Sequence, residues 1–134
     1  MYLVDANVWL ERLLDQERSE EVGRFLDGIP SEQLFVTDFA FHSVALTLIR
    51  LNHADDLSRF VQDIFVDGSV VLVHLRPEDT PRILAAMQQF NLDFDDAYQS
   101  IAAELFALTL VSFDADFDRT SRGRKLPREI MVEK

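Results

Sequence analysis

The sequence contains no cysteine among its 134 residues. This absence excludes disulfide scaffolds, thiolate zinc sites, iron–sulfur clusters and cysteine nucleophiles. Glycine and proline are also scarce, with four of each, and no linker rich in them divides the chain. The apolar runs are far shorter than the roughly 20 residues that a membrane-spanning helix needs. The first residues lack the features of a signal peptide. We therefore expect a cytoplasmic protein with one domain over residues 1–134 and no membrane segment.

Positive charge is in deficit, because 13 Lys and Arg stand against 24 Asp and Glu, giving a formal net charge of −11 at pH 7. Such a balance opposes non-specific binding to nucleic acid. The local pattern differs from this average, since five basic residues crowd one ten-residue stretch: Arg119, Arg122, Arg124, Lys125 and Arg128. An acidic site that holds divalent cations can still face a phosphate, so the local pattern is the one to test.

Short apolar runs alternate with longer amphipathic segments along the chain. The runs predict four β-strands, with a weak fifth at 130–132; the four lie at 2–4, 34–37, 70–75 and 110–113. The segments between them predict helices at 6–15, 19–28, 39–51, 54–65, 77–90 and 93–108. We expect Ser19 and Asp38 to cap the helices that follow them. Strands that alternate with helices indicate an α/β fold with a parallel sheet covered on both faces.

Acidic residues collect where ligands bind in such sheets, beyond the carboxyl ends of the strands. Asp5 follows the first strand and Asp114 follows the fourth. Asp96 lies in the first turn of the helix that returns to the fourth strand, so it belongs to the same edge. His42 lies within one turn of the start of another helix at this edge. Asp93, Asp95 and Asp116 lie close by in the sequence.

Converging carboxylates repel one another and raise one another's pKa values. A hard divalent cation such as Mg²⁺ or Mn²⁺ relieves this repulsion, because it prefers oxygen ligands. It can also activate a water and stabilise the charge that builds up during phosphodiester cleavage. The acidic pattern therefore indicates metal-dependent hydrolysis of phosphate esters.

Each of these residues also has a purely structural interpretation. An Asp after a strand or at a helix start often serves only as a cap, which applies to Asp93 and Asp95. A His on an apolar helix, such as His42, is more often a core residue than a ligand. Asn7 can cap a helix or orient the neighbouring carboxylate, and Ser112 can pair locally. The basic stretch can equally be a solvated loop.

Three segments, in this order around an apolar central helix, resemble the PIN-domain family, which includes the VapC ribonuclease toxins. They are residues 4–10 (VDANVWL), 92–97 (LDFDDA) and 110–117 (LVSFDADF). The resemblance covers almost the full length. It implies a single PIN-like domain, a three-layer α/β/α sandwich with a four- to five-stranded parallel sheet.

The resemblance also implies an endoribonuclease that depends on Mg²⁺ or Mn²⁺. The catalytic metal ligands implied are Asp5, Asp96 and Asp114, with Asp116 as an accessory ligand. Supporting roles fall on Asn7, His42, Asp93, Asp95 and Ser112. The basic residues expected to contact the RNA backbone are Arg119, Arg122, Arg124 and Lys125.

One position departs from the family pattern. The family usually carries a Glu early in the helix after the second strand, and here that position holds His42 or Ser43. A neutral His binds Mn²⁺ but suits Mg²⁺ poorly. The site then keeps fewer negative charges, for which Asp93 or Asp95 can compensate.

The family resemblance further implies a homodimer and an antitoxin protein partner whose peptide occupies the site. A PIN-like nucleic-acid- or protein-binding module with an impaired site is the alternative, because the usual Glu is missing. Two other α/β classes fit less well. A haloacid-dehalogenase-type domain needs an Asp where Asn7 stands, and a receiver domain needs an Asp where His74-Leu75-Arg76 follows the third strand.

Overall fold

The computed structural model describes the backbone of residues 1–133 and the side chains of residues 1–131. Its four strands are β1 Tyr2–Val4, β2 Leu34–Thr37, β3 Val71–Val73 and β4 Thr109–Val111. They form one sheet in the order β3-β2-β1-β4, and all pairings are parallel. Leu3 of β1 pairs with Phe35 on one side and Leu110 on the other. The strand order therefore switches between β1 and β4, where open α/β sheets bind ligands.

Helices and short turns fill the connections between the strands. The α-helices are α1 Ala6–Leu13, α2 Ser19–Gly28, α3 Asp38–Arg50, α4 Ala54–Val61, α5 Thr80–Phe90, α6 Phe94–Leu105 and α7 Pro127–Glu133. The shorter turns are η1 Ser31–Gln33, the π-helical η2 Gln62–Val66, η3 Pro77–Asp79 and η4 Ala115–Arg119. Within the described residues, no helix combines the length and apolar character needed to cross a membrane.

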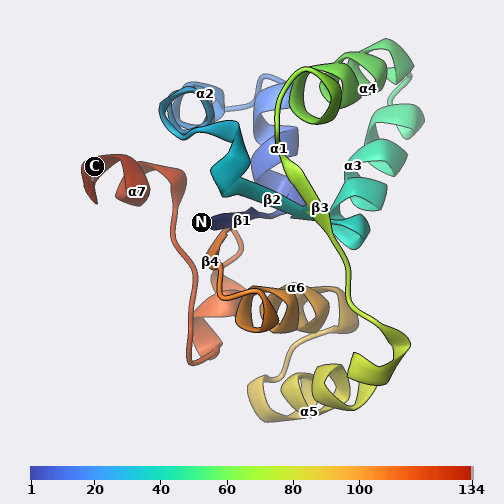
Figure 1. Ribbon diagram of the computed structural model, residues 1–134, viewed down its shortest axis with the longest axis vertical. Coiled ribbons are helices and arrows are strands. Elements are labelled where there is room, and N and C mark those ends of the chain that lie inside the picture. Colours follow the sequence, from blue (N-terminus) through green and yellow to red (C-terminus); the bar gives the residue numbers. More distant parts are fainter. Residues whose placement is uncertain (134) are drawn as a thin grey trace.

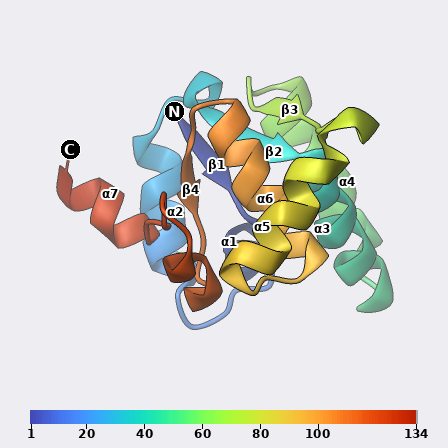
Figure 2. The same ribbon diagram turned by 90° about the horizontal axis from the view of Figure 1, so that it is seen from below.

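The elements form three layers, as the α/β/α prediction requires. Figure 1 shows α1 to α4 on one face of the sheet and α5 and α6 on the other. The view from below in Figure 2 shows α7 beside α2, at the far side from α5.

Two apolar cores separate the sheet from its two helical layers. Leu3 packs into the core beneath α5 and α6, and the next residue, Val4, packs into the core beneath α1 to α4. Successive strand side chains point to opposite faces, so both residues are fully buried. This double burial explains why the strands read as continuous apolar runs.

The expected fifth strand at 130–132 is wrong, because this segment belongs to helix α7. Pro127 stands at the first position of the helix, where its fixed φ suits helical backbone and its missing N–H costs nothing. The Glu129 carboxylate accepts a 2.9 Å hydrogen bond from the Leu126 N–H just before the helix. Ile130 is 1% exposed and joins the core beneath α1 to α4. Packing of α7 against α2, rather than strand pairing, accompanies the burial of Ile130.

Several element ends also differ from the sequence prediction. Arg18 rather than Ser19 is the N-cap of α2, and Thr37 rather than Asp38 is the N-cap of α3. The Thr37 hydroxyl accepts a 2.9 Å hydrogen bond from the Ala40 N–H, which lets α3 begin one residue early. The strand expected at 70–75 keeps only Val71–Val73, and α6 ends at Leu105 rather than at residue 108.

Candidate metal centre

Two carboxylates follow the neighbouring strands β1 and β4 at the carboxyl edge of the sheet. Asp5 directly follows β1 and is the N-cap of α1. Its carboxylate accepts a 2.9 Å hydrogen bond from the Ala6 N–H. Asp114 follows β4 and caps η4, where its carboxylate accepts a 2.9 Å hydrogen bond from the Asp116 N–H. Both side chains line one cleft, because the two strands run side by side in the same direction.

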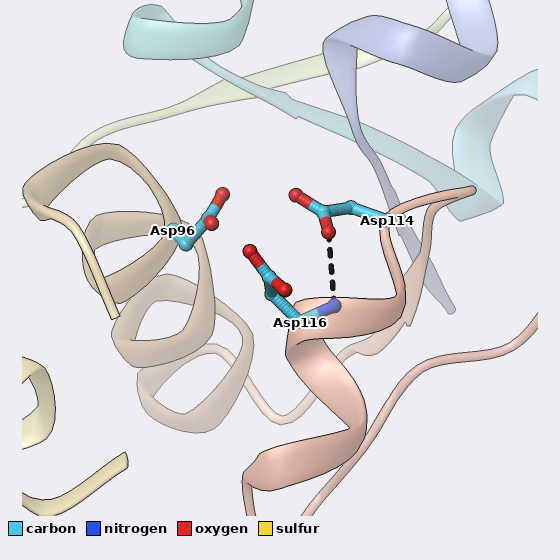
Figure 3. Close-up of side chains that lie close together, drawn as sticks. All are labelled: Asp96, Asp114 and Asp116. Atoms are coloured by element: carbon cyan, nitrogen blue, oxygen red, sulfur yellow. Dashed lines mark hydrogen bonds between the residues drawn. The ribbon is translucent and has the colours of Figure 1, made fainter. Parts of the chain in front are cut away.

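A third carboxylate reaches this edge from α6. Asp96 lies in the first turn of that helix, as the sequence predicts. Oxygen atoms of Asp96, Asp114 and Asp116 all lie within 4.8 Å of one another. Figure 3 shows the three side chains turned toward one another, Asp96 from α6 on one side, and Asp116 of η4 with Asp114 just before it on the other. We call these three residues the acidic cluster.

Asp5 lies beside the cluster and is held by its own set of donors. The Ser112 hydroxyl donates to it at 2.8 Å, the Gln99 amide at 3.1 Å and the Asn7 amide at 3.4 Å. These bonds favour the charged form, but burial opposes them more strongly and raises the pKa of Asp5 above its usual value. The carboxylate is therefore fixed in position and short of positive charge.

Ser112 joins the two strand-end carboxylates through one hydroxyl group. Its O–H donates to the Asp5 carboxylate, and its oxygen accepts a 3.0 Å hydrogen bond from the Asp114 N–H. The side-chain N–H of Asn7 donates to the same oxygen at 3.1 Å, and the side-chain oxygen of Asn7 accepts from the Phe113 N–H at 3.1 Å. Asn7 and Ser112 thus tie the start of α1 to the end of β4.

Two buried polar residues complete this network, and neither was picked out from the sequence. Gln99 is 4% exposed on α6, and its carbonyl oxygen accepts a 2.5 Å hydrogen bond from the hydroxyl of Thr37, which is fully buried. Gln99 follows Asp96 by three residues, a spacing that puts both on one helix face. That spacing was the available signal for Gln99.

The acidic cluster carries more negative charge than its surroundings balance. Burial, followed by repulsion from Asp114, Asp93, Asp5 and Asp116, raises the pKa of Asp96 from 3.8 to about 7. A divalent cation between these side chains would relieve that repulsion. The donor atoms are all carboxylate oxygens, which are the ligands that Mg²⁺ and Mn²⁺ prefer. The residues present therefore fit a hard divalent ion.

A cleft of about 230 Å³ opens over this centre. It is lined by Asp5, Ala6, Asn7, Leu10, Phe39, Ala40, Ser43, Asp95, Asp96, Gln99 and Asp114. Of the two positions left open for the usual Glu, Ser43 lines the cleft. His42 is exposed on α3 and is not among the lining residues. Of these two positions, the one that lines the cleft therefore offers a hydroxyl and not a carboxylate.

The family of the chain follows from its sequence together with this fold and site. A comparison with protein-family models matches residues 2–123 to the PIN domain. The chain belongs to the PIN-domain family.

Solved structures share the fold of this PIN domain over nearly their whole length. VapC20 from Mycobacterium tuberculosis, described as a sarcin-ricin loop cleaving toxin, has a TM-score of 0.79 at 14% identity, covering 95% of this chain and 100% of that chain. A chain of a toxin–antitoxin complex from Klebsiella pneumoniae has a TM-score of 0.74 at 20% identity, covering 95% and 98%. FitAcB from Neisseria gonorrhoeae has a TM-score of 0.72 at 19% identity, covering 95% and 98%. Comparison with curated proteins gave no match.

The remaining acidic candidates of the PIN domain lie at the rim of the site. Asp93 is exposed and acts as the N-cap of α6, where it accepts a 2.9 Å hydrogen bond from the Asp96 N–H. Asp95 is exposed and lines the cleft. Both residues add negative charge near the acidic cluster, although only Asp95 faces the open space.

Several residues of the basic stretch already form hydrogen bonds or ion pairs within the PIN domain. The Arg119 guanidinium pairs with the Asp116 carboxylate at 2.6 Å and also donates to the Asn91 carbonyl. Arg124 binds the Asp118 carboxylate through two 3.2 Å hydrogen bonds. Arg122 donates to the Leu108 carbonyl at 3.0 Å. The backbone N–H of Lys125 donates to the Leu110 carbonyl at 2.8 Å.

Proposed function

We propose that this PIN domain is a metal-dependent endoribonuclease that hydrolyses RNA phosphodiester bonds, as the toxin of a toxin–antitoxin pair. The observation that carries the proposal is the approach of Asp96, Asp114 and Asp116 to within 4.8 Å beside the partly buried Asp5. Family membership supports a nuclease, and the presence of toxins among the structural neighbours supports the toxin role.

In this proposal Asp5, Asp96 and Asp114 hold Mg²⁺ or Mn²⁺, with Asp116 as an accessory ligand. When bound, such an ion supplies an activated water and stabilises the charge on the phosphate during in-line attack. The protein's contribution is preorganisation of the ligands, because carboxylates that are fixed before binding need little rearrangement.

The supporting residues perform that preorganisation. Ser112, Asn7 and Gln99 each donate to Asp5, and Ser112 also accepts from the backbone of Asp114. Asp93 fixes the first turn of α6 through the Asp96 N–H. These contacts hold ligands from three distant parts of the chain at one edge of the sheet.

RNA and an antitoxin are the proposed partners, together with a second copy of the chain. The basic residues Arg119, Arg122, Arg124 and Lys125 are proposed to face the RNA backbone. The acidic cleft would also bind a basic side chain of an antitoxin, because the charged N–H groups of Arg and Lys pair with carboxylates. The exposed apolar side chains of Leu46 and Ile49 on α3 support a homodimer.

A binding module without turnover is the second candidate function. Ser43 favours it, because the hydroxyl in the cleft leaves the site one carboxylate short of the usual family set. Such a module would bind RNA or protein in either Mg²⁺ or Mn²⁺ without cleaving RNA.

Cleavage of RNA by the purified chain decides between the two functions. We expect cleavage with Mg²⁺ or Mn²⁺, none with EDTA, and none by Asp96→Asn. Asp27→Asn removes one charge from an exposed position of α2 and is the matched control, which should cleave normally. Cleavage that survives both EDTA and Asp96→Asn would contradict a metal-dependent nuclease. RNA binding without turnover in either metal would favour the second function.

A further inference from the structure

Arg18 and Phe113 form a cation–π pair, and Phe113 directly precedes Asp114 of the acidic cluster. The guanidinium carbon of Arg18 lies 4.4 Å from the centre of the Phe113 ring. Phe113 stands between Ser112 and Asp114, and its backbone N–H donates to Asn7. The ring therefore belongs to the same short segment that carries Asp114.

The backbone of Arg18 is held as well as its side chain. Its N–H donates a 3.0 Å hydrogen bond to the Glu11 carboxylate of α1, and the residue is the N-cap of α2. The residue is exposed although its guanidinium lies over the ring. An arginine held in this way loses less conformational freedom when it binds a ligand than a free surface arginine does.

The charge of Arg18 is not neutralised by a carboxylate in the described part of the chain. Two arginines of the basic stretch differ in this respect, because Arg119 pairs with Asp116 and Arg124 pairs with Asp118. Arg18 was not singled out in the sequence, since it lies about a hundred residues away from that stretch. Its link to the site is its contact with the ring of Phe113, which directly precedes Asp114.

We propose that Arg18, held over Phe113, binds a backbone phosphate of single-stranded RNA at the rim of the acidic cleft. This inference rests on the proposed ribonuclease function. An RNA backbone that approaches several carboxylates is repelled unless fixed positive charge lies nearby. A guanidinium donates to phosphate oxygens through a rigid set of N–H groups, and its stacking on the ring fixes the direction of these groups.

RNA binding can be measured in the Asp96→Asn background, so that cleavage does not consume the ligand. The readout is the fluorescence anisotropy of a short labelled single-stranded RNA across a range of salt concentrations. We expect Arg18→Gln to weaken binding about tenfold at low salt. It should also reduce the steepness of the log–log salt dependence by about 0.7, the contribution of one phosphate contact in a single strand.

Arg50→Gln is the matched control, because it removes the same charge from an exposed position at the far end of α3. It should leave the salt dependence unchanged. Arg18→Lys keeps the charge and should retain most of the salt dependence while losing part of the affinity. Equal effects of Arg18→Gln and Arg50→Gln, or an unchanged salt dependence in Arg18→Gln, would overturn the inference.

Failure of the inference and failure of the ribonuclease proposal give different results. If the native chain cleaves RNA while Arg18→Gln binds and cleaves it normally, the phosphate contact is absent and the ribonuclease function stands. If the native chain cleaves no RNA and the Asp96→Asn chain binds none, both are overturned. If the contact exists, Arg18→Gln in an otherwise native chain should raise KM more than it lowers kcat.

Discussion

The side-chain amide of Gln99 on α6 donates a 3.1 Å hydrogen bond to the partly buried carboxylate of Asp5, which follows β1. The other end of the same amide accepts from the Thr37 hydroxyl at 2.5 Å. One neutral side chain therefore connects the ends of β1 and β2 to the helix that carries Asp96. Because Gln99 is neutral, it adds no charge to a site in which the carboxylates already repel one another.

Gln99→Leu should lower the free energy of unfolding by about 1 to 3 kcal/mol, because it removes the acceptor of the buried Thr37 hydroxyl and one of the hydrogen-bond donors to Asp5. Urea-induced unfolding measures the change. Gln88→Leu, at an exposed position of α5, is the control and should change the free energy of unfolding by less than about 0.5 kcal/mol. Similar losses in the two variants would mean that the network adds little to stability.

Asp96 should make the stability of the metal-free protein fall as the pH rises. Its pKa is about 7 in the folded chain against an ordinary 3.8, so folding favours the protonated form. The stabilising contribution is therefore complete below pH 3.8 and is lost as the pH rises through 7. Asp96→Asn cannot ionise there, and its melting temperature in EDTA should exceed that of the native chain above pH 7.

The comparison of melting temperatures across the pH range tests this directly. The advantage of Asp96→Asn should shrink as the pH falls toward 3.8, where the native carboxyl is protonated. Asp27→Asn, on the exposed face of α2, should show no such pH-dependent difference. A constant offset between Asp96→Asn and the native chain at every pH would argue against a shifted pKa for Asp96.

The placement of Asp5, Asp114 and Asp96 at one edge could be predicted because it follows from topology alone. An Asp that directly follows a buried strand lies at the carboxyl edge, and a helix that returns to the next strand starts there. Gln99 and Thr37 could not be placed in this way. Their contact depends on how α6 is rotated against the sheet, and many side chains far apart in the sequence decide that rotation.

The type of secondary structure could not be predicted where an apolar run was short. The Ile130-Met131-Val132 run fits a strand or a helix equally well, because three residues show no periodicity. Burial of Ile130 against the α2 side settled it as a helix. Likewise, neighbouring residues on a helix point about 100° apart, so sequence could not decide whether His42 or Ser43 faces the site.

Arg119 should weaken cation binding at the acidic cluster, because its guanidinium already lies 2.6 Å from an Asp116 oxygen. Arg119→Gln removes this competing charge, and we expect Mn²⁺ to bind several-fold more tightly by calorimetry. Arg122→Gln is the control. Arg122 belongs to the same basic stretch, but its guanidinium donates to the Leu108 backbone carbonyl rather than to a carboxylate of the acidic cluster. An equal gain in both variants would point to net charge alone, and a loss in Arg119→Gln would mean that Arg119 holds Asp116 in place for the metal.

Ser43→Glu should strengthen the site, because it adds a carboxylate to the cleft that already holds Asp5, Asp96 and Asp114. One added negative charge near the metal should tighten Mn²⁺ binding by about tenfold, and RNA cleavage should rise with it. In EDTA the same variant should melt at a lower temperature than the native chain, since the new carboxylate adds to the repulsion. Added Mn²⁺ should reverse that loss.

His42→Glu is the matched control, because it puts the same side chain one position away on the exposed side of α3. It should leave Mn²⁺ affinity and cleavage near their native values. If His42→Glu strengthens the site and Ser43→Glu does not, then the cleft is lined by a different face of α3 from the one described. If neither variant changes Mn²⁺ affinity, the missing Glu does not limit this site, and the acidic cluster with Asp5 is sufficient for the cation by itself.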